Sequence, residues 1–337
     1  MNPHPPASES PGRPICVLGL GLIGGSLVRA AAVAGRAVWA ATASETTAEA
    51  ARADGYDVAA DNSEALARAD EADALVVLAM PLPAVAGVLA RVNELAPRAR
   101  LTDVVSVKAA MRDLVARHAP DTRYVGGHPM AGTEESGWAA GSATLFAGAN
   151  WVLGSDDEVD TEVWADVAEL AWACGSRVVP AGVEEHDAAV ARISHLPHLL
   201  AAVLAGVAEG DPHAQGMLGT GPGLGELPLT LAAGSFADGT RVAGTRPELV
   251  LAMCEGNRAG LLAAVDDALG RLGAARGALA STGGLAATVN AGYAARQRWH
   301  SAQHAPTVRV ARDTKPAALR ELGRRGEVLL GWSNQTL

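Results

Sequence analysis

The sequence predicts an α/β fold, with a doubly wound, mostly parallel sheet at the N-terminus and an all-helical domain after it. Three observations support this. A glycine-rich turn, Gly19-Leu-Gly-Leu-Ile-Gly24, joins a short apolar run to an Ala-rich stretch. Apolar runs of strand length then alternate with helical stretches to about residue 182. From residue 183 onward the apolar spacing is helical to about residue 302.

The composition bounds the class of protein. The 337 residues are 49% hydrophobic, which suits two domains with a sizeable core. The formal charge of −10 argues against a nucleic-acid surface. No apolar run approaches the length of a bilayer span, and the N-terminus does not resemble a signal peptide. Cys16, Cys174 and Cys254 are widely spaced and odd in number, as is typical of free thiols. We therefore expect a cytoplasmic protein with neither nucleic-acid nor membrane partners.

The expected organisation has four parts. A disordered tail (1–14) precedes a dinucleotide-binding domain (15–182), a helical domain (183–304) and a C-terminal extension (305–337). Within the second part the expected strands are Ile15–Leu18, Ala37–Ala41, Ala74–Ala79, Leu101–Val105, Arg123–Gly126, Asn150–Leu153 and Arg177–Pro180. The expected helices include Gly24–Ala34, Thr46–Ala53 and Thr161–Ala173.

The glycine turn predicts a Rossmann-type dinucleotide site. Gly19 allows the tight turn, Gly21 lets the backbone approach a pyrophosphate, and Gly24 lets helix and strand pack closely. The helix N-terminus then attracts the phosphate charge. The expected cofactor contacts are Gly19, Leu20, Gly21, Leu22, Ile23 and Gly24. The alternative is a glycine-rich turn that binds no ligand.

The choice between NAD and NADP stays open. An acidic residue commonly ends the second strand of this fold and holds the ribose hydroxyls. Here Thr42 and Ser44 occupy that region, and it holds no arginine for a 2′-phosphate. Because ligands bind beyond the carboxyl ends of parallel strands, Gly19, Met80 with Pro81, Ser106 and His128 should converge on one crevice.

Several residues near that crevice suit proton chemistry. His128 lies in a glycine-flanked strand end and is a candidate base, because its pKa ordinarily lies near neutral pH; the alternative is a role in shaping the loop. Ser106 can donate and accept hydrogen bonds, or can cap a helix. Lys108 either binds an anion or lies on the surface, and Glu134 is close enough in sequence to line the same pocket.

The helical domain offers a second set of candidates. His195 and His198 share a helix face, but no carboxylate or cysteine completes a zinc pattern, so we expect no metal site; core histidines are the alternative. Arg241 suits carboxylate capture, or a salt bridge to Asp238. The strongly apolar helices indicate either faces buried against another subunit or a large monomeric core.

Taken together, the segments resemble the prephenate/arogenate dehydrogenase family of tyrosine biosynthesis, in order, over roughly residues 15 to 300. The resemblance rests on an ordered set of motifs: Gly19–Gly25, Asp103–Lys108, Gly127–Gly132 with Glu134 and Gly137, Leu145-Phe146, Glu185-His-Asp187, Ser194–His198, Thr240–Ala243 and Asn257. It implies oxidative decarboxylation of prephenate or arogenate with NAD(P)⁺, and a homodimer built through the helical domain.

The resemblance also implies roles for individual residues. His128 matches the base on the substrate hydroxyl, and Ser106 matches the serine that hydrogen-bonds that hydroxyl. Arg241 matches the arginine that grips a substrate carboxylate. The remaining matches are His198 and, less closely, His195 on the substrate side, Glu134 as a pocket-gating acid, and Gly234 approaching from the partner subunit.

The sequence departs from the family in places. Ala237 stands where many members carry an arginine, and residues 305–337 are too short for a full ACT regulatory domain, leaving a truncated remnant or an ordinary extension. Two other classes of protein are alternatives. A hydroxyacid dehydrogenase would want a catalytic lysine in the helical domain, whereas the only lysines are Lys108 and Lys315. A non-catalytic NAD(H) sensor could dispense with His128, Ser106 and Arg241.

Overall fold

The structure is a computed structural model that describes residues 12–133, 135–209, 226–281, 283–302 and 305–333. The chain divides into two compact units, the first made of Met1–Asp187 with Thr282–Leu337 and the second of Ala188–Ser281.

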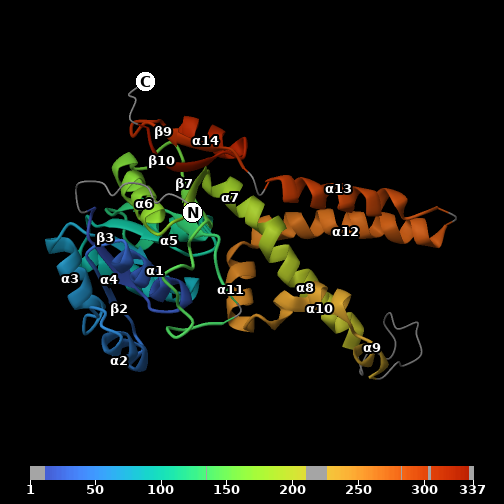
Figure 1. The fold of residues 1–337 in the computed structure, drawn as a ribbon, viewed down its shortest axis with the longest axis horizontal. Helices are drawn as coiled ribbons and strands as arrows, with labels where there is room; N and C mark the ends of the chain where they lie inside the picture. The colour runs from blue at the N-terminus through green and yellow to red at the C-terminus, as the bar shows by residue number, and fades with distance from the viewer. Residues whose placement is uncertain (1–11, 134, 210–225, 282, 303–304, 334–337) are drawn as a thin grey trace. The chain divides into compact units, whose positions relative to one another are not determined.

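The strands, in chain order, are β1 (Ile15–Leu18), β2 (Val38–Ala41), β3 (Leu75–Leu78), β4 (Arg100–Asp103), β5 (Arg123–Val125), β6 (Gly127–Pro129), β7 (Asn150–Gly154), β8 (Arg177–Ala181), β9 (Thr307–Val310) and β10 (Val328–Trp332). The helices are α1 (Leu22–Val33), α2 (Glu45–Ala53), α3 (Asn62–Glu71), α4 (Leu82–Leu95), α5 (Ala109–His118), α6 (Thr161–Ala173), α7 (Val183–Val190), η1 (Ala191–His195), α8 (Leu196–Glu209), α9 (Leu227–Thr230), α10 (Gly234–Thr240), η2 (Arg241–Gly244), α11 (Pro247–Gly256), α12 (Arg258–Ala280), α13 (Ala286–Ala302) and α14 (Pro316–Arg324). Figure 1 shows their order by colour.

The first sheet has the strand order β2-β1-β3-β4-β5, and every pairing in it is parallel. Successive side chains of a strand point to opposite faces. Ile15 and Val17 accordingly join a core cluster with residues of α1 and α6, whereas Cys16 and Leu18 join a second cluster with residues of α3, α4 and α5. Helices thus cover both faces of the sheet, which confirms the predicted Rossmann-type doubly wound fold.

A second sheet, with the order β6-β7-β8-β10-β9, completes the first unit. The prediction of one sheet through residue 182 was therefore wrong. The chain leaves the first sheet at Gly126 and pairs antiparallel with β7 from Gly127 onward. A Cβ atom at Gly127 would lie 2.7 Å from the Asp103 carbonyl oxygen, so glycine is required where the two sheets approach. Residues 305–333 supply β9 and β10 to this sheet, and their helix α14 packs on β8, so they belong to the first unit and not to a separate domain.

The folded part of the first unit begins before the expected end of the tail. Arg13 donates to the Asp166 carboxylate at 2.9 Å and also pairs with Asp73. The Pro14 carbonyl accepts a hydrogen bond from the Leu75 amide at 2.9 Å. Residues 1–11, the rest of the predicted tail, lie outside the described residues.

The second unit is helical over the part that the structure describes. Helices α9 and α10 pack on α8 (Figure 1). The 3₁₀ turn η2 also packs on α8, and α12 packs on η1. A π-helical turn, η1, immediately precedes α8, which carries Pro197 at its second position. Large apolar side chains of α8 stay exposed in the single chain, including Val203 at 54% and Val207 at 74%. Such exposure favours burial against another subunit over a monomeric core.

One continuous helix, Val183–Glu209, is long and apolar enough to cross a membrane by length and composition. The expectation that no segment approaches such a span does not hold for it. Only 22% of its most apolar window is buried inside the molecule. A helix that buries an apolar face against a second protein chain passes the same test, and one such helix is weak evidence for a membrane.

Candidate active site

The glycine turn has the geometry that a dinucleotide requires. Gly19 has a φ of +107°, and a Cβ there would overlap the Ala79 carbonyl. A Cβ at Gly24 would overlap the Gly19 carbonyl, so these two glycines are fixed by packing. A Cβ at Gly21 would meet nothing within 4 Å, which leaves the backbone there open to a ligand. The residues present therefore fit the pyrophosphate of NAD(P).

Helix α1 differs from its neighbours at its N-terminus. Helices α2, α3 and α6 are capped by the side chains of Ser44, Asp61 and Asp160. In the described part of the chain no side chain caps α1, and its first turn holds no acidic residue. Its first amide N–H groups are thus left for an anionic ligand, since a helix N-terminus attracts negative charge.

The other predicted cofactor residues lie at strand ends. Met80 follows β3, and its amide nitrogen would lie 3.3 Å from a Cβ atom at Gly19. The ends of β1 and β3 therefore lie side by side. Pro81 is the N-cap residue of α4. The Ser44 hydroxyl accepts a hydrogen bond from the Thr47 amide at 3.3 Å, and the Ser44 amide donates to the Thr42 hydroxyl at 3.4 Å. Both hydroxyls therefore help to begin α2, at the place where the ribose binds in this fold.

A buried ion-pair cluster contacts β6, the strand that carries the candidate base His128. Lys108 pairs with Asp103, and their side chains are 2% and 0% exposed. The Lys108 ammonium also donates to the Gly127 carbonyl at 2.7 Å, and the Tyr124 hydroxyl donates to Asp103 at 2.6 Å. Burial lowers the pKa of Lys108, against the opposing effect of Asp103, and burial with the Asp103 charge raises the pKa of Tyr124.

This placement corrects the expectation for Lys108. Neither a surface position nor direct capture of an anion fits an ammonium group that is sealed from solvent and already paired. Lys108 instead joins the end of β4 to the residue preceding His128, so it holds the two sheets together at the site.

A second polar group, here termed the histidine relay, consists of His128, His186 and Asp187. His128 Nδ1 lies 2.8 Å from His186 Nε2, and His186 Nδ1 lies 2.7 Å from Asp187 Oδ1. The two rings are nearly perpendicular, with centroids 5.1 Å apart. His186 is buried, whereas His128 is half-buried. The relay thus runs from the buried Asp187 carboxylate to a His128 ring that is partly open to solvent.

The relay has defined charges. Burial lowers the pKa of His186 below the ordinary histidine value, although its hydrogen bond to Asp187 acts in the opposite direction. Burial alone would raise the pKa of Asp187, but hydrogen bonds from His186 and from the amides of Lys108 and Ala109 outweigh it and lower the pKa. At neutral pH the interior end is therefore a carboxylate beside a neutral imidazole.

Asp187, and not Ser106, caps the N-terminus of α5. The amides of Lys108 and Ala109, at the start of α5, donate to the Asp187 carboxylate at 2.8 and 2.9 Å. Helix α5 is therefore capped by a residue far away in sequence, and Ser106, two residues before its N-cap position, does not cap it. The half-buried Ser106 side chain stays a candidate for the site.

The predicted substrate-binding residues of the second unit differ in burial. His195 is buried, with its Nδ1 atom 3.2 Å from Asn257 Nδ2. His198 Nδ1 donates to the Ser194 carbonyl at 2.8 Å, one helical turn earlier. Arg241 is exposed at the start of η2, and Gly234 is exposed at the start of α10. Glu134, the predicted gating acid, lies outside the described residues.

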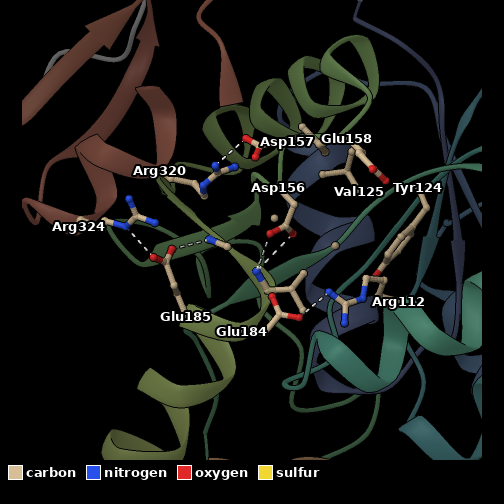
Figure 2. Close-up of a pocket in the computed structure, with 15 residues that line it drawn as sticks. Arg112, Tyr124, Val125, Asp156, Asp157, Glu158, Glu184, Glu185, Arg320 and Arg324 are labelled. Atoms are coloured by element: carbon tan, nitrogen blue, oxygen red, sulfur yellow. Dashed lines mark hydrogen bonds and ion pairs between the residues drawn. The ribbon is translucent and has the colours of Figure 1, made fainter. Parts of the chain in front are cut away.

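A large open cleft of about 560 Å³ lies elsewhere in the first unit (Figure 2). Neither His128 nor Ser106 lines it. Its three arginines are neutralised by carboxylates: Arg112 pairs with Glu184, Arg320 with Asp157, and Arg324 with Glu185. The cleft is therefore no ready anion site, and it is separate from the histidine relay.

Two residues of the relay were not among the candidate site residues predicted from the sequence. His186 and Asp187 were visible in the sequence as an adjacent His-Asp pair, and a histidine beside a carboxylate is a common way to orient a base. What the sequence did not show is that His186 contacts His128, 58 residues away.

The glycine turn and the predicted crevice define a class, the NAD(P)-dependent dehydrogenases, and comparison with known proteins agrees. Residues 29–180 match the model of the prephenate dehydrogenase nucleotide-binding domain, and residues 182–283 match that of the prephenate dehydrogenase dimerization domain. The chain belongs to the prephenate dehydrogenase family. It carries both the nucleotide-binding and the dimerisation domain of that family, which confirms the resemblance seen in the sequence.

Individual relatives cover most of the chain. A cyclohexadienyl dehydrogenase from Zymomonas mobilis is 33% identical over 279 residues, which are 80% of this chain and 89% of that protein. The crystal structure of a candidate prephenate dehydrogenase from Corynebacterium glutamicum is 41% identical with a TM-score of 0.86, over 96% of this chain and all of that one. A Synechocystis arogenate dehydrogenase is 27% identical with a TM-score of 0.70, over 85% and 99%. These relatives are consistent with a soluble biosynthetic enzyme.

Proposed function

We propose that this enzyme is a prephenate dehydrogenase, which converts prephenate to 4-hydroxyphenylpyruvate by NAD(P)-dependent oxidative decarboxylation in tyrosine biosynthesis. The observation that carries the proposal is the half-buried His128 ring, held by His186 beyond a Rossmann-type sheet in a chain of this family. Arogenate is the alternative substrate, favoured by the similarity to an arogenate dehydrogenase. We place the enzyme in the cytoplasm as a homodimer formed through its helical domain.

The residue types suit the reaction. A bound NAD(P)⁺ would supply the acceptor for the hydride that leaves the ring carbon bearing the hydroxyl. Loss of that hydride requires a base on the hydroxyl proton, and His128 is assigned this role. Ser106 is assigned the hydrogen bond that orients the same hydroxyl. The ring carboxylate leaves as CO₂ without a strong acid catalyst, because aromatisation drives that step.

The remaining assignments concern substrate and cofactor binding. Arg241 is assigned to a substrate carboxylate, since a guanidinium binds carboxylates in a bidentate manner. His198 and His195 are assigned to the substrate side, Glu134 to gating, and Gly234 to an approach from the partner subunit. The turn Gly19–Gly24 is assigned to the pyrophosphate, with Thr42, Ser44, Met80, Pro81 and Ser106 lining the rest of the cofactor.

The direct test is the rate of NAD(P)H formation by purified protein with prephenate or arogenate, each with NAD⁺ and NADP⁺. Turnover of prephenate supports the proposal, and the four rates rank both substrates and both cofactors. Turnover of arogenate alone would replace the substrate. Absence of turnover in all four, with cofactor binding still detectable, would point to a sensor or an unrelated dehydrogenase.

The Arg241 assignment has its own test. Arg241→Leu should raise the KM for substrate by about tenfold or more, since a lost charged hydrogen bond costs about 1.5–3 kcal/mol. Arg271→Leu is the matched control, because Arg271 is an exposed arginine of the same unit, paired to Asp267 along α12. An unchanged KM in Arg241→Leu would exclude the assigned contact.

A further inference from the structure

The hydrogen bonds of the histidine relay have directions that follow from chemistry alone. An ionised carboxylate accepts hydrogen bonds and cannot donate them. Asp187, whose pKa is lowered, is ionised at neutral pH, so the 2.7 Å contact is a donation from His186 Nδ1 to Asp187 Oδ1. The proton of His186 is therefore on Nδ1.

The next bond follows from the first. Burial keeps His186 neutral, and a neutral imidazole carries a proton on one nitrogen only. With Nδ1 protonated, His186 Nε2 must accept, so His128 Nδ1 is the donor of the 2.8 Å bond. In its neutral form His128 then carries its lone pair on Nε2.

Other charges beside His186 do not disturb this order. Lys108 and Asp103 also face His186, and they form an ion pair with each other. Their effects on His186 have opposite signs, the lysine disfavouring and the aspartate favouring its protonated form. The remaining polar group of that cluster, Tyr124, donates its proton to Asp103.

We propose that His186 and Asp187 are positioning residues that set the tautomer of His128 and thereby make Nε2 the basic nitrogen. This rests on the proposed role of His128 as base. Once Nε2 takes the substrate proton, the His128 Nδ1–H bond to His186 becomes a charge-assisted bond, which is stronger than a neutral one. The Asp187 carboxylate lies one ring further and balances the new charge.

The same carboxylate fixes the relay in space. Asp187 receives the first amides of α5, so His186 is tied to the segment that also carries Ser106. Changing Asp187 would remove both the helix cap and the end of the relay. His186 is the better residue to change, because its side chain bonds only within the relay among the described contacts.

The test compares two substitutions of His186. His186→Leu removes the acceptor from His128, whereas His186→Gln supplies an amide oxygen that can still accept. We expect kcat to fall about 10²-fold in His186→Leu, since a misoriented catalytic group can cost that much, with KM and cofactor affinity changed less than twofold. His186→Gln should recover most of kcat. His300→Leu, at an exposed histidine of α13, is the control.

A second measurement reads the tautomer without substrate. Imidazole ¹⁵N chemical shifts of histidine-labelled protein, assigned to His128 by their loss in His128→Asn, should show the neutral ring protonated on Nδ1. In His186→Leu the ring should populate both tautomers. Thermal unfolding of each variant establishes that it is folded.

Each outcome decides one proposal. A His128 ring protonated on Nε2 in the unmodified enzyme would overturn the relay, as would a His186→Leu variant with unchanged kcat and tautomer. An unmodified enzyme that turns over neither substrate, yet shows Nδ1 protonated on His128, would overturn the proposed function and leave the tautomer assignment standing.

Discussion

The buried ion-pair cluster and the histidine relay are two polar groups that meet at the start of α5 and differ in one respect. In the first, Asp103 and Lys108 are sealed from solvent. In the second, His186 and Asp187 at the interior end are also buried, but His128 at the other end is half-buried. The Asp103–Lys108 pair is closed to ligands, so it can only stabilise the fold. The histidine relay has a partly exposed ring at one end, so it can exchange a proton with a ligand. The partial exposure of the His128 ring thus distinguishes a group that can react from one that only supports the fold.

The largest expected effect lies at the open end. His128→Asn keeps a polar side chain of similar shape but removes the base, so turnover should fall by about 10²–10⁴-fold, the usual contribution of a general base. Cofactor affinity should be nearly unchanged, because the glycine turn is intact. Steady-state rates and a fluorescence titration with the dinucleotide measure both. Retention of activity within tenfold would break the comparison, because the open end would then carry no chemistry.

The closed cluster should respond in stability instead. Lys108→Met leaves the Asp103 carboxylate buried without its cation, which typically costs about 3–5 kcal/mol of unfolding free energy. Chemical denaturation measures this. The double variant Lys108→Met with Asp103→Asn removes both charges and should recover part of the loss. A single variant as stable as the unmodified protein would contradict the structural role of the pair.

A smaller loss of stability is expected from a change of Tyr124 in the buried ion-pair cluster. Tyr124→Phe removes the hydroxyl that donates to Asp103 at 2.6 Å. A hydrogen bond to a charged group contributes about 1.5–3 kcal/mol, so the free energy of unfolding should fall by that amount. With saturating substrates, kcat should change less than threefold. A large fall in kcat with unchanged stability would place Tyr124 in the reaction.

The smallest effect is a pH dependence of stability that belongs to the relay. Because burial lowers the pKa of His186, the unfolded chain binds a proton there before the folded chain does. The unfolding free energy should therefore decrease as pH falls below about 6.5, by at most about 1.4 kcal/mol per pH unit for one proton. Denaturation between pH 7 and 5 should show a shallower decrease in His186→Gln. Equal slopes in the two proteins would mean that His186 does not bind its proton differently on folding.

Sequence patterns predicted the local elements well. The strand Ile15–Leu18 and the helix Thr161–Ala173 were expected with the bounds that the structure has. Both depend on nearest neighbours in the chain: an apolar run before a glycine turn, and an apolar periodicity after Asp160, which caps the helix. The glycine turn itself was readable because each glycine has a separate local reason to be there.

The failures concern partners that are distant in sequence. The switch of sheet at Gly126–Gly127 depends on pairing with β7, and the second sheet is completed by β10, some 200 residues later. Lys108 resembled a surface lysine because its partners, Asp103 and the Gly127 carbonyl, meet only in the folded state. Ser106 resembled a helix cap because Asp187, which takes that role, is 79 residues from Lys108.

The π-helical turn Ala191–His195 has a consequence for the evolution of this chain. A π turn holds one more residue than an α turn, so the five residues Ala191–His195 turn the chain by about as much as four α-helical residues do at about 100° each. Deleting one residue within this turn would therefore restore regular α-helix and leave the later positions of α8 on nearly the same face. The exposed row that contains Val203 and Val207 would keep its direction. A deletion in the regular helix between this turn and Val203 would instead rotate that row by about 100°, so the π turn is the place where α8 can lose a residue and still offer the same surface to a partner.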